Sequence, residues 1–319
     1  MPMFLNVLFL IIGMFLLIKG ADWFVDGASD VAKALKIPSL IIGLTLVSIG
    51  TSLPEASVSA IGSLSGKNDI ALGNIMGSNI CNSLLILGLS AIFMPMVVDK
   101  DMKMFHIPIL ILLSALLILF CFVITPNVID LMEGIIFILL FVGYLVFLVF
   151  RTKSTQPMLD QSEEKEDEKK RPMWLSIIFV IIGIVGIVFG GEFVVKTASF
   201  IAIELGMSEI LVGLTIVAVG TSLPELVTSV IASIKKEDDI AIGNVIGSNI
   251  FNIVFILGIS SALSPIVVAP ESIIDMLIMT AIVILIFAFV LLSKKMSRWH
   301  GISLVLLYVA YVVYIIIRN

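Results

Sequence analysis

The chain has 319 residues, of which 60% are hydrophobic and 13% charged, and its mean hydropathy is +1.20. This composition excludes a water-soluble domain, and the net charge of −5 identifies no partner by itself. Apolar runs of about 20 residues recur, the length that crosses a ~30 Å hydrocarbon core. We therefore expect an integral membrane protein with the lipid bilayer as partner and no nucleic acid. Both cysteines lie in apolar runs and no HExxH or CxxC pattern occurs, so neither a disulfide nor a cofactor is expected.

In chain order, the expected elements are apolar helices, five before and five after a polar stretch. Residues 3–20 have no basic residue before them and no small-residue cleavage site, so a first membrane helix is expected rather than a signal peptide. The predicted fold class is an all-α integral membrane protein with about ten transmembrane helices. The other expected segments are 37–63, 70–94, 104–124, 128–150, 173–192, 208–233, 240–268, 272–293 and 300–317.

The polar stretch, residues 151–172, contains six basic and six acidic residues. Such a composition is typical of a solvated linker without a site of its own. It divides the chain into a first half, residues 1–150, and a second half, residues 173–319.

The two halves are copies of one sequence unit. After a shift of 170 residues, GLTLVSIGTSLPE (43–55) aligns with GLTIVAVGTSLPE (213–225), and DIALGNIMGSNICN (69–82) aligns with DIAIGNVIGSNIFN (239–252). Within 43–98, 30 of 56 positions are identical to their counterparts. The sequence therefore predicts an internal structural repeat.

An odd number of crossings per unit requires the second copy to be inverted relative to the first. With the N-terminus placed outside, the inside loops hold fifteen basic residues and the outside loops three, a strong positive-inside asymmetry. We therefore expect two inverted five-helix repeats in the plasma membrane, with residues 151–172 in the cytoplasm. Inverted repeats with broken helices are typical of transporters, whose site lies at the repeat interface.

Pro54 lies inside an apolar segment, within the motif GTSLPE. It has no N–H and its ring clashes with the carbonyl of Gly50, which frees the carbonyls of residues 48–51 from helical hydrogen bonds. In a bilayer such a break is tolerated only where protein or a water-filled cavity supplies partners, and a cation is one such partner. The same argument applies to Pro224 and residues 218–221.

Polar residues recur at helical spacing on both sides of each break and form one stripe in each half, to which the following helix adds residues four apart. Their hydroxyl, amide and carboxylate oxygens are hard ligands that suit Na⁺ or Ca²⁺ better than zinc or copper. The stripes comprise Thr45, Ser48, Ser52, Glu55, Ser59, Asn74, Ser78 and Asn82 in the first half, and Thr215, Ala218, Ser222, Glu225, Ser229, Asn244, Ser248 and Asn252 in the second.

A packing role competes with ion binding for each serine, because small residues also line helix crossings and GNIMG and GNVIG are both GxxxG patterns. The glutamates are different. An ionised carboxylate in the bilayer core costs at least ~2.5–3.5 kcal/mol, and no lysine or arginine lies in the core of these segments. A bound cation is therefore the expected partner of Glu55 and Glu225, whereas Asp22 and Asp26 are expected at the membrane interface.

GTSLPE with GNxxGSNxxN, present twice in inverted halves, resembles the two alpha-repeats of the sodium/calcium exchanger family, within the calcium/cation antiporter superfamily. The resemblance covers nearly the whole chain apart from the linker and is strongest to the small prokaryotic members. It implies a calcium site with carboxylate ligands and threonine carbonyls, a middle position with asparagines, and two sodium sites. By position, the resemblance assigns the calcium site to Glu55, Glu225, Thr51 and Thr221, and the middle position to Asn82 and Asn252. It assigns one sodium site to Ser48, Ser52 and Ser78, and the other to Ala218, Ser222 and Ser248.

Two departures from related patterns refine this expectation. Some relatives, including potassium-dependent ones, carry aspartate where this chain has Asn252, which argues against potassium co-transport. The proton/calcium branch usually shows GNxxE where this chain has GTSLPE, which favours sodium as the driving ion.

We therefore predict a secondary antiporter, not an enzyme, that exchanges three Na⁺ for one Ca²⁺ by alternating access and functions as a monomer. By the resemblance, the long segments near 3–30 and 173–203 would slide against a fixed eight-helix core. A proton-driven antiporter of Ca²⁺ or another divalent cation is the nearest alternative, and a channel is less favoured because nothing indicates a pore of several subunits. An intramembrane hydrolase is a distant alternative. Such proteases use paired aspartates, whereas the paired acids of this chain are glutamates within stripes of serine and threonine.

Overall fold

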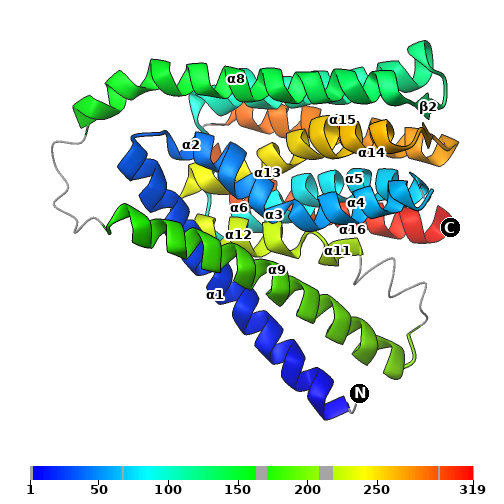
Figure 1. The fold of residues 1–319 in the computed structure, drawn as a ribbon, viewed down its shortest axis with the longest axis horizontal. Helices are drawn as coiled ribbons and strands as arrows, with labels where there is room; N and C mark the ends of the chain where they lie inside the picture. Colours follow the sequence, from blue (N-terminus) through cyan, green and yellow to red (C-terminus); the bar gives the residue numbers. More distant parts are fainter. Residues whose placement is uncertain (1–2, 67, 163–170, 208–217, 294, 319) are drawn as a thin grey trace.

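The computed structural model describes residues 3–66, 68–162, 171–207, 218–293 and 295–318. The all-α prediction is confirmed, because long helices form the molecule (Figure 1) and the short strands only join helix ends. β1 (Met96–Val97) pairs with β4 (Lys295–Met296), and β2 (Val128–Ile129) pairs with β3 (Ile266–Val267). Each pair therefore connects the first half to the second.

The sequence repeat is also a structural repeat. The first half contains α1 (Met3–Leu35), α2 (Ser39–Ile42), η1 (Gly43–Val47), α3 (Ser48–Thr51), α4 (Leu53–Leu64), α5 (Asn68–Cys81), η2 (Asn82–Ile86), α6 (Leu87–Phe93), η3 (Met102–His106), α7 (Ile107–Leu119), η4 (Phe120–Ile124) and α8 (Leu131–Ser162), where η marks a π-helical turn. The second half contains α9 (Met173–Glu204), α11 (Ala218–Gly220), α12 (Leu223–Ile234), α13 (Asp238–Phe251), η6 (Asn252–Ile256), α14 (Leu257–Leu263), α15 (Pro270–Leu292) and α16 (Arg298–Arg318). The bounds of α4, α5, η2 and α6 return 170 residues later as those of α12, α13, η6 and α14.

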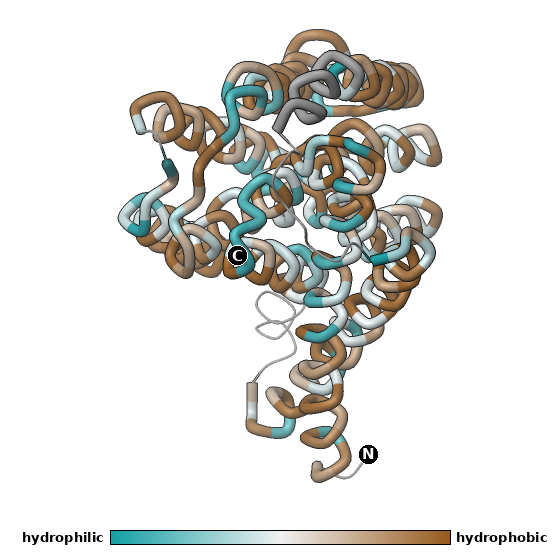
Figure 2. Tube along the Cα trace, turned by 90° about the vertical axis from the view of Figure 1, so that its left-hand side faces the viewer, coloured by the Kyte–Doolittle hydropathy of each residue, from teal (hydrophilic) through white to brown (hydrophobic). Residues whose placement is uncertain are grey.

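Eight helices among the described residues are long and apolar enough to cross a membrane, and the broken helix formed by Ser39–Thr51 and Leu53–Leu64 gives a ninth. The expected segment 208–233 lies partly outside the described residues, and its described part consists of α11 and α12. This count agrees with the prediction of about ten spans. Figure 2 shows hydrophobic residues along most of the outer helices, as a multi-pass membrane protein requires.

Helix α8 continues into the polar stretch that the sequence assigns to a linker. The expected apolar segment ends at residue 150, whereas α8 ends at Ser162. The difference arises because hydropathy locates the end of the apolar segment, while backbone hydrogen bonds can continue a helix into water.

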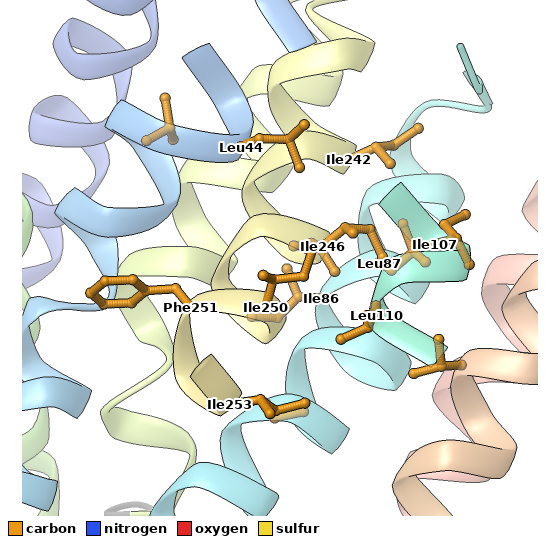
Figure 3. Close-up of a cluster of buried hydrophobic side chains, with 14 of the residues drawn as sticks. Leu44, Ile86, Leu87, Ile107, Leu110, Ile242, Ile246, Ile250, Phe251 and Ile253 are labelled. Carbon is orange, nitrogen blue, oxygen red and sulfur yellow. The ribbon is translucent and has the colours of Figure 1, made fainter. Parts of the chain in front are cut away.

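Two equivalent helical spans form the centre of the fold. In the span Asp238–Leu263, 94% of the apolar window is buried, and in Ile70–Phe93 78% is buried, while the other long spans are at most 39% buried. Figure 3 shows side chains of α13 and η6 packed against η1, η2, α6 and α7. The labelled members are Leu44, Ile86, Leu87, Ile107, Leu110, Ile242, Ile246, Ile250, Phe251 and Ile253. These two spans carry the polar GNxxGSNxxN motifs, so most residues of the motifs lie in the protein interior.

Helices α1 and α9 pack against each other along their glycines, and the pair extends away from the other helices at one end (Figure 1). A Cβ atom at Gly20 would lie 2.7 Å from the backbone nitrogen of Ile187, and one at Gly183 would lie 2.7 Å from that of Phe24. Only glycine allows this backbone approach. These helices are the two segments predicted to slide, and the sliding itself stays a prediction.

Asp22 and Asp26 of α1 are paired with basic side chains. Lys235, at the end of α12, lies 2.6 Å from a carboxylate oxygen of each, and Arg171 lies 3.7 Å from Asp26. Both aspartates are about one-third exposed. They therefore have ionic partners other than a transported ion and connect α1 to the end of α12.

Candidate ion-binding site

Each half presents its glutamate at the start of a helix that follows a break. Ser52 (φ −84°, ψ 9°) precedes α4 and Ser222 (φ −90°, ψ 7°) precedes α12, both with non-helical backbone. The two arms of the first broken helix differ in direction by 50°. Glu55 and Glu225 lie in the first turn of α4 and α12. There the positive end of the helix dipole stabilises a carboxylate.

A serine hydroxyl of each half donates a hydrogen bond to the glutamate of the other half. Ser52 Oγ donates to Glu225 Oε1 at 2.8 Å, and Ser222 Oγ donates to Glu55 Oε1 at 3.2 Å. All four side chains are at most 1% exposed. The inverted repeat therefore places both glutamates in one buried site at the repeat interface.

Serines of the two halves form hydrogen bonds with each other, while the predicted sodium sites, with Ser78 beside Ser52 and Ser248 beside Ser222, stay predictions. Ser52 Oγ lies 3.0 Å from Ser248 Oγ, which also lies 3.4 Å from the backbone oxygen of Ser48. Ser222 Oγ lies 3.3 Å from Ser78 Oγ. The reason is that α3 packs against α13 of the opposite half, so each stripe meets the second motif of the other repeat.

The asparagine of each GNxxG pattern supports the helix that carries the glutamate. Asn74 Nδ2 donates to the backbone oxygen of Glu55 at 3.2 Å and to Ser59 Oγ at 3.0 Å. The same two contacts recur in the second half, where Asn244 Nδ2 donates to the backbone oxygen of Glu225 at 3.4 Å and to Ser229 Oγ at 2.9 Å. These bonds fix each broken helix against the following one.

The two threonines of the GTS motifs are held by the opposite half. Thr51 Oγ1 donates to Asn244 Oδ1 at 3.1 Å, and Thr221 Oγ1 donates to Asn74 Oδ1 at 3.5 Å. These two contacts place both threonines at the repeat interface, beside the helices that carry the glutamates.

The asparagines that close the motifs begin π-helical turns. Asn82 starts η2 and Asn252 starts η6, and both are at most 1% exposed. Short π-helical turns inside α-helices frequently lie at functional sites. Asn82 Nδ2 donates to Asn249 Oδ1 at 3.1 Å, and Asn252 Nδ2 donates to Asn79 Oδ1 at 2.9 Å.

Four buried acceptor atoms of this region have no hydrogen-bond partner among the described residues. They are Oε2 of Glu55, Oε2 of Glu225, Oδ1 of Asn82 and Oδ1 of Asn252, two equivalent pairs from the two halves. Within the same part of the chain, no ion pair involves either glutamate. Buried acceptors without donors are costly, and carboxylate and amide oxygens are ligands for hard cations. The arrangement is therefore suited to holding a cation.

The remaining predicted residue, Ala218, begins α11, and its side chain lies outside the described residues. The sequence analysis includes Asn74 and Asn244 in the polar stripes but omits two asparagines that the structure places among them, Asn79 and Asn249. Both are identical between the halves at the 170-residue shift, which is the signal that could have identified them.

Comparison with known proteins agrees with this geometry. The profile of the family described as "Sodium/calcium exchanger protein" matches residues 5–150 and 175–317. The chain is 34% identical to the sodium/calcium exchanger MaX1 of Methanosarcina acetivorans, over 97% of both chains, and 39% identical to the inner membrane protein YrbG of Escherichia coli, over 82% of this chain and 81% of that protein. A solved structure of the sodium-calcium exchanger NCX_Mj superposes with a TM-score of 0.85 at 32% identity, covering 98% of this chain and all of the other.

A family match over both halves, full-length relatives and a shared fold agree with a pair of buried glutamates at the interface of two repeats. The chain therefore belongs to the sodium/calcium exchanger family, and it is a multi-pass membrane antiporter of cations rather than an enzyme.

Proposed function

We propose that this chain exchanges Na⁺ for Ca²⁺, with the sodium gradient as the energy source, and that both ions use the site between Glu55 and Glu225. The observation that carries the proposal is the set of four buried oxygens, on Glu55, Glu225, Asn82 and Asn252, that have no hydrogen-bond partner among the described residues. With the carbonyls of Thr51 and Thr221, these groups supply six oxygen-bearing ligands, within the range that Ca²⁺ takes. Two carboxylates match the charge of one Ca²⁺.

Two flanking groups of neutral oxygens are the proposed sodium sites. One comprises the Ser48 carbonyl with the hydroxyls of Ser52 and Ser248, and the other comprises the Ala218 carbonyl with the hydroxyls of Ser222 and Ser78. Each group includes a serine that donates to a glutamate, so each lies beside the shared carboxylates.

The proposed cycle is alternating access in one chain. α1 and α9, joined by their glycine-mediated contact, slide across the core and expose the site to one side of the membrane at a time. The distribution of basic residues supports a plasma-membrane orientation with the N-terminus outside and residues 151–172 in the cytoplasm.

The direct test is ⁴⁵Ca²⁺ uptake into proteoliposomes loaded with sodium, potassium or acid. We expect uptake with an outward sodium gradient and none with an equal potassium gradient or a proton gradient. Uptake driven by the proton gradient alone would replace this proposal with the proton-driven alternative.

The grouping of the serines gives a second prediction. Ser52→Ala and Ser248→Ala are expected to raise the sodium concentration for half-maximal exchange and to combine non-additively, because both remove ligands of one proposed site. Ser52→Ala and Ser78→Ala are expected to combine additively, because they act at different sites. Sodium titration of calcium efflux measures both pairs, and the reverse pattern would contradict the grouping across the halves.

A further inference from the structure

We propose that Asn79 and Asn249 are positioning residues that orient the side chains of Asn82 and Asn252, so that each presents its carbonyl oxygen, and not its amide NH₂ group, to the transported cation. This inference rests on the function proposed above and concerns two residues that make no contact with the ion themselves.

The orientation of a buried asparagine needs a cause. The oxygen and nitrogen ends of an amide group are nearly equal in size, so packing alone does not choose between them. A cation is attracted by the oxygen end and repelled by the NH₂ end. If either Asn82 or Asn252 were turned by 180°, the site would therefore lose a ligand and gain a repulsive group.

The cause is a pair of hydrogen bonds that cross between the halves. Asn249 Oδ1 accepts from Asn82 Nδ2 at 3.1 Å, and Asn79 Oδ1 accepts from Asn252 Nδ2 at 2.9 Å. All four side chains are at most 1% exposed. With each NH₂ group held by the opposite repeat, Oδ1 of Asn82 and Oδ1 of Asn252 are the ends left without a partner among the described residues.

The positioning residues are themselves oriented by further hydrogen bonds. Asn249 Nδ2 donates to Ser83 Oγ at 2.7 Å, and its oxygen end faces Asn82. Asn79 Nδ2 donates to the backbone oxygen of Asn249 at 3.3 Å, so its oxygen end faces Asn252. The four amide groups therefore form one hydrogen-bond network. Its two atoms without a partner among the described residues, Oδ1 of Asn82 and Oδ1 of Asn252, are both oxygens.

A double-mutant cycle tests whether Asn249 acts through Asn82. The proteins are wild type, Asn82→Ala, Asn249→Ala and the double variant, and the measurement is the Ca²⁺ dissociation constant of purified protein by calorimetry without sodium. Asn249→Ala is expected to weaken Ca²⁺ binding roughly 2- to 10-fold, the range that one neutral hydrogen bond supplies. In the Asn82→Ala background the same change is expected to have no effect, because no amide remains to orient.

Asn74→Ala is the matched control, since Asn74 is a motif asparagine on α5 that does not hydrogen-bond Asn82. Its effect is expected to be the same with and without Asn82→Ala. An equal factor for Asn249→Ala in both backgrounds, or no change in wild type, would overturn the inference. If Asn249→Ala does not fold, the cycle of Asn79→Ala with Asn252→Ala decides by the same criterion. Absence of Ca²⁺ binding by the wild-type chain would instead refute the proposed function.

Discussion

Glu55→Gln and Glu225→Gln are each expected to abolish sodium-driven calcium uptake while leaving a folded protein. Glutamine keeps the shape of the side chain and can still accept a hydrogen bond from the serine of the opposite half, Ser222 or Ser52. It removes one of the two negative charges that balance Ca²⁺ in a site without basic partners among the described residues. Removing one partner of a buried charge pair costs about 3–5 kcal/mol, which is more than 100-fold in affinity.

Glu133→Gln is the matched control for these variants. Glu133 is also buried, at 2% exposed, but it lies in the first turn of α8 and accepts hydrogen bonds from Thr125 and the backbone of Asp130. We expect lower thermal stability with calcium uptake retained. Strong uptake by either Glu55→Gln or Glu225→Gln would show that the two carboxylates do not share one ion.

Exchange is expected to respond to membrane voltage. The site carries two buried carboxylates, and the asparagines Asn82 and Asn252 add no charge. One Ca²⁺ balances this pair, whereas Na⁺ in the central site and in both proposed flanking sites would bring one charge more. A 3:1 exchange would move one net charge per cycle, worth ~2.3 kcal/mol per 100 mV. That energy shifts the equilibrium calcium ratio about 50-fold.

The measurement is sodium-driven calcium flux in proteoliposomes whose voltage is set by potassium and valinomycin. An interior-positive potential is expected to favour the exit of sodium and the entry of calcium, and an interior-negative potential to oppose them. The control is the same potassium gradient without valinomycin. If voltage of either sign left the rate and the equilibrium point unchanged, the exchange would be electroneutral and the count of three sodium ions would be wrong.

The sequence predicted the repeat and the breaks because both depend on local signals. Pro54 and Pro224 interrupt their helices whatever surrounds them, and the 170-residue shift reappears in the bounds of α4 and α12. The absence of basic residues in these segments predicted a bound cation as the partner of Glu55 and Glu225, and this stays a prediction. Hydropathy did not predict the end of α8 at Ser162, because helical hydrogen bonds do not stop where the apolar residues do.

The partners of the serines and asparagines were not predictable in the same way. Ser52 lies beside Ser248 because α3 packs against α13, and spacing within one half contains no information about the opposite half. Asn79 and Asn249 received no role for the same reason, since each supports an asparagine of the other repeat. The inversion of the repeats indicates that such contacts exist, and only the packed structure identifies them.

The most direct test of the shared site is equilibrium binding of Ca²⁺ to the purified chain, with sodium as competitor. We predict one Ca²⁺ per chain, displaced by Na⁺ with a Hill coefficient above one because several sodium ions replace one calcium ion, and no binding after Glu55→Gln or Glu225→Gln. Two independent Ca²⁺ ions per chain, binding that sodium does not displace, or unchanged binding in either variant would contradict a single site shared by the two halves.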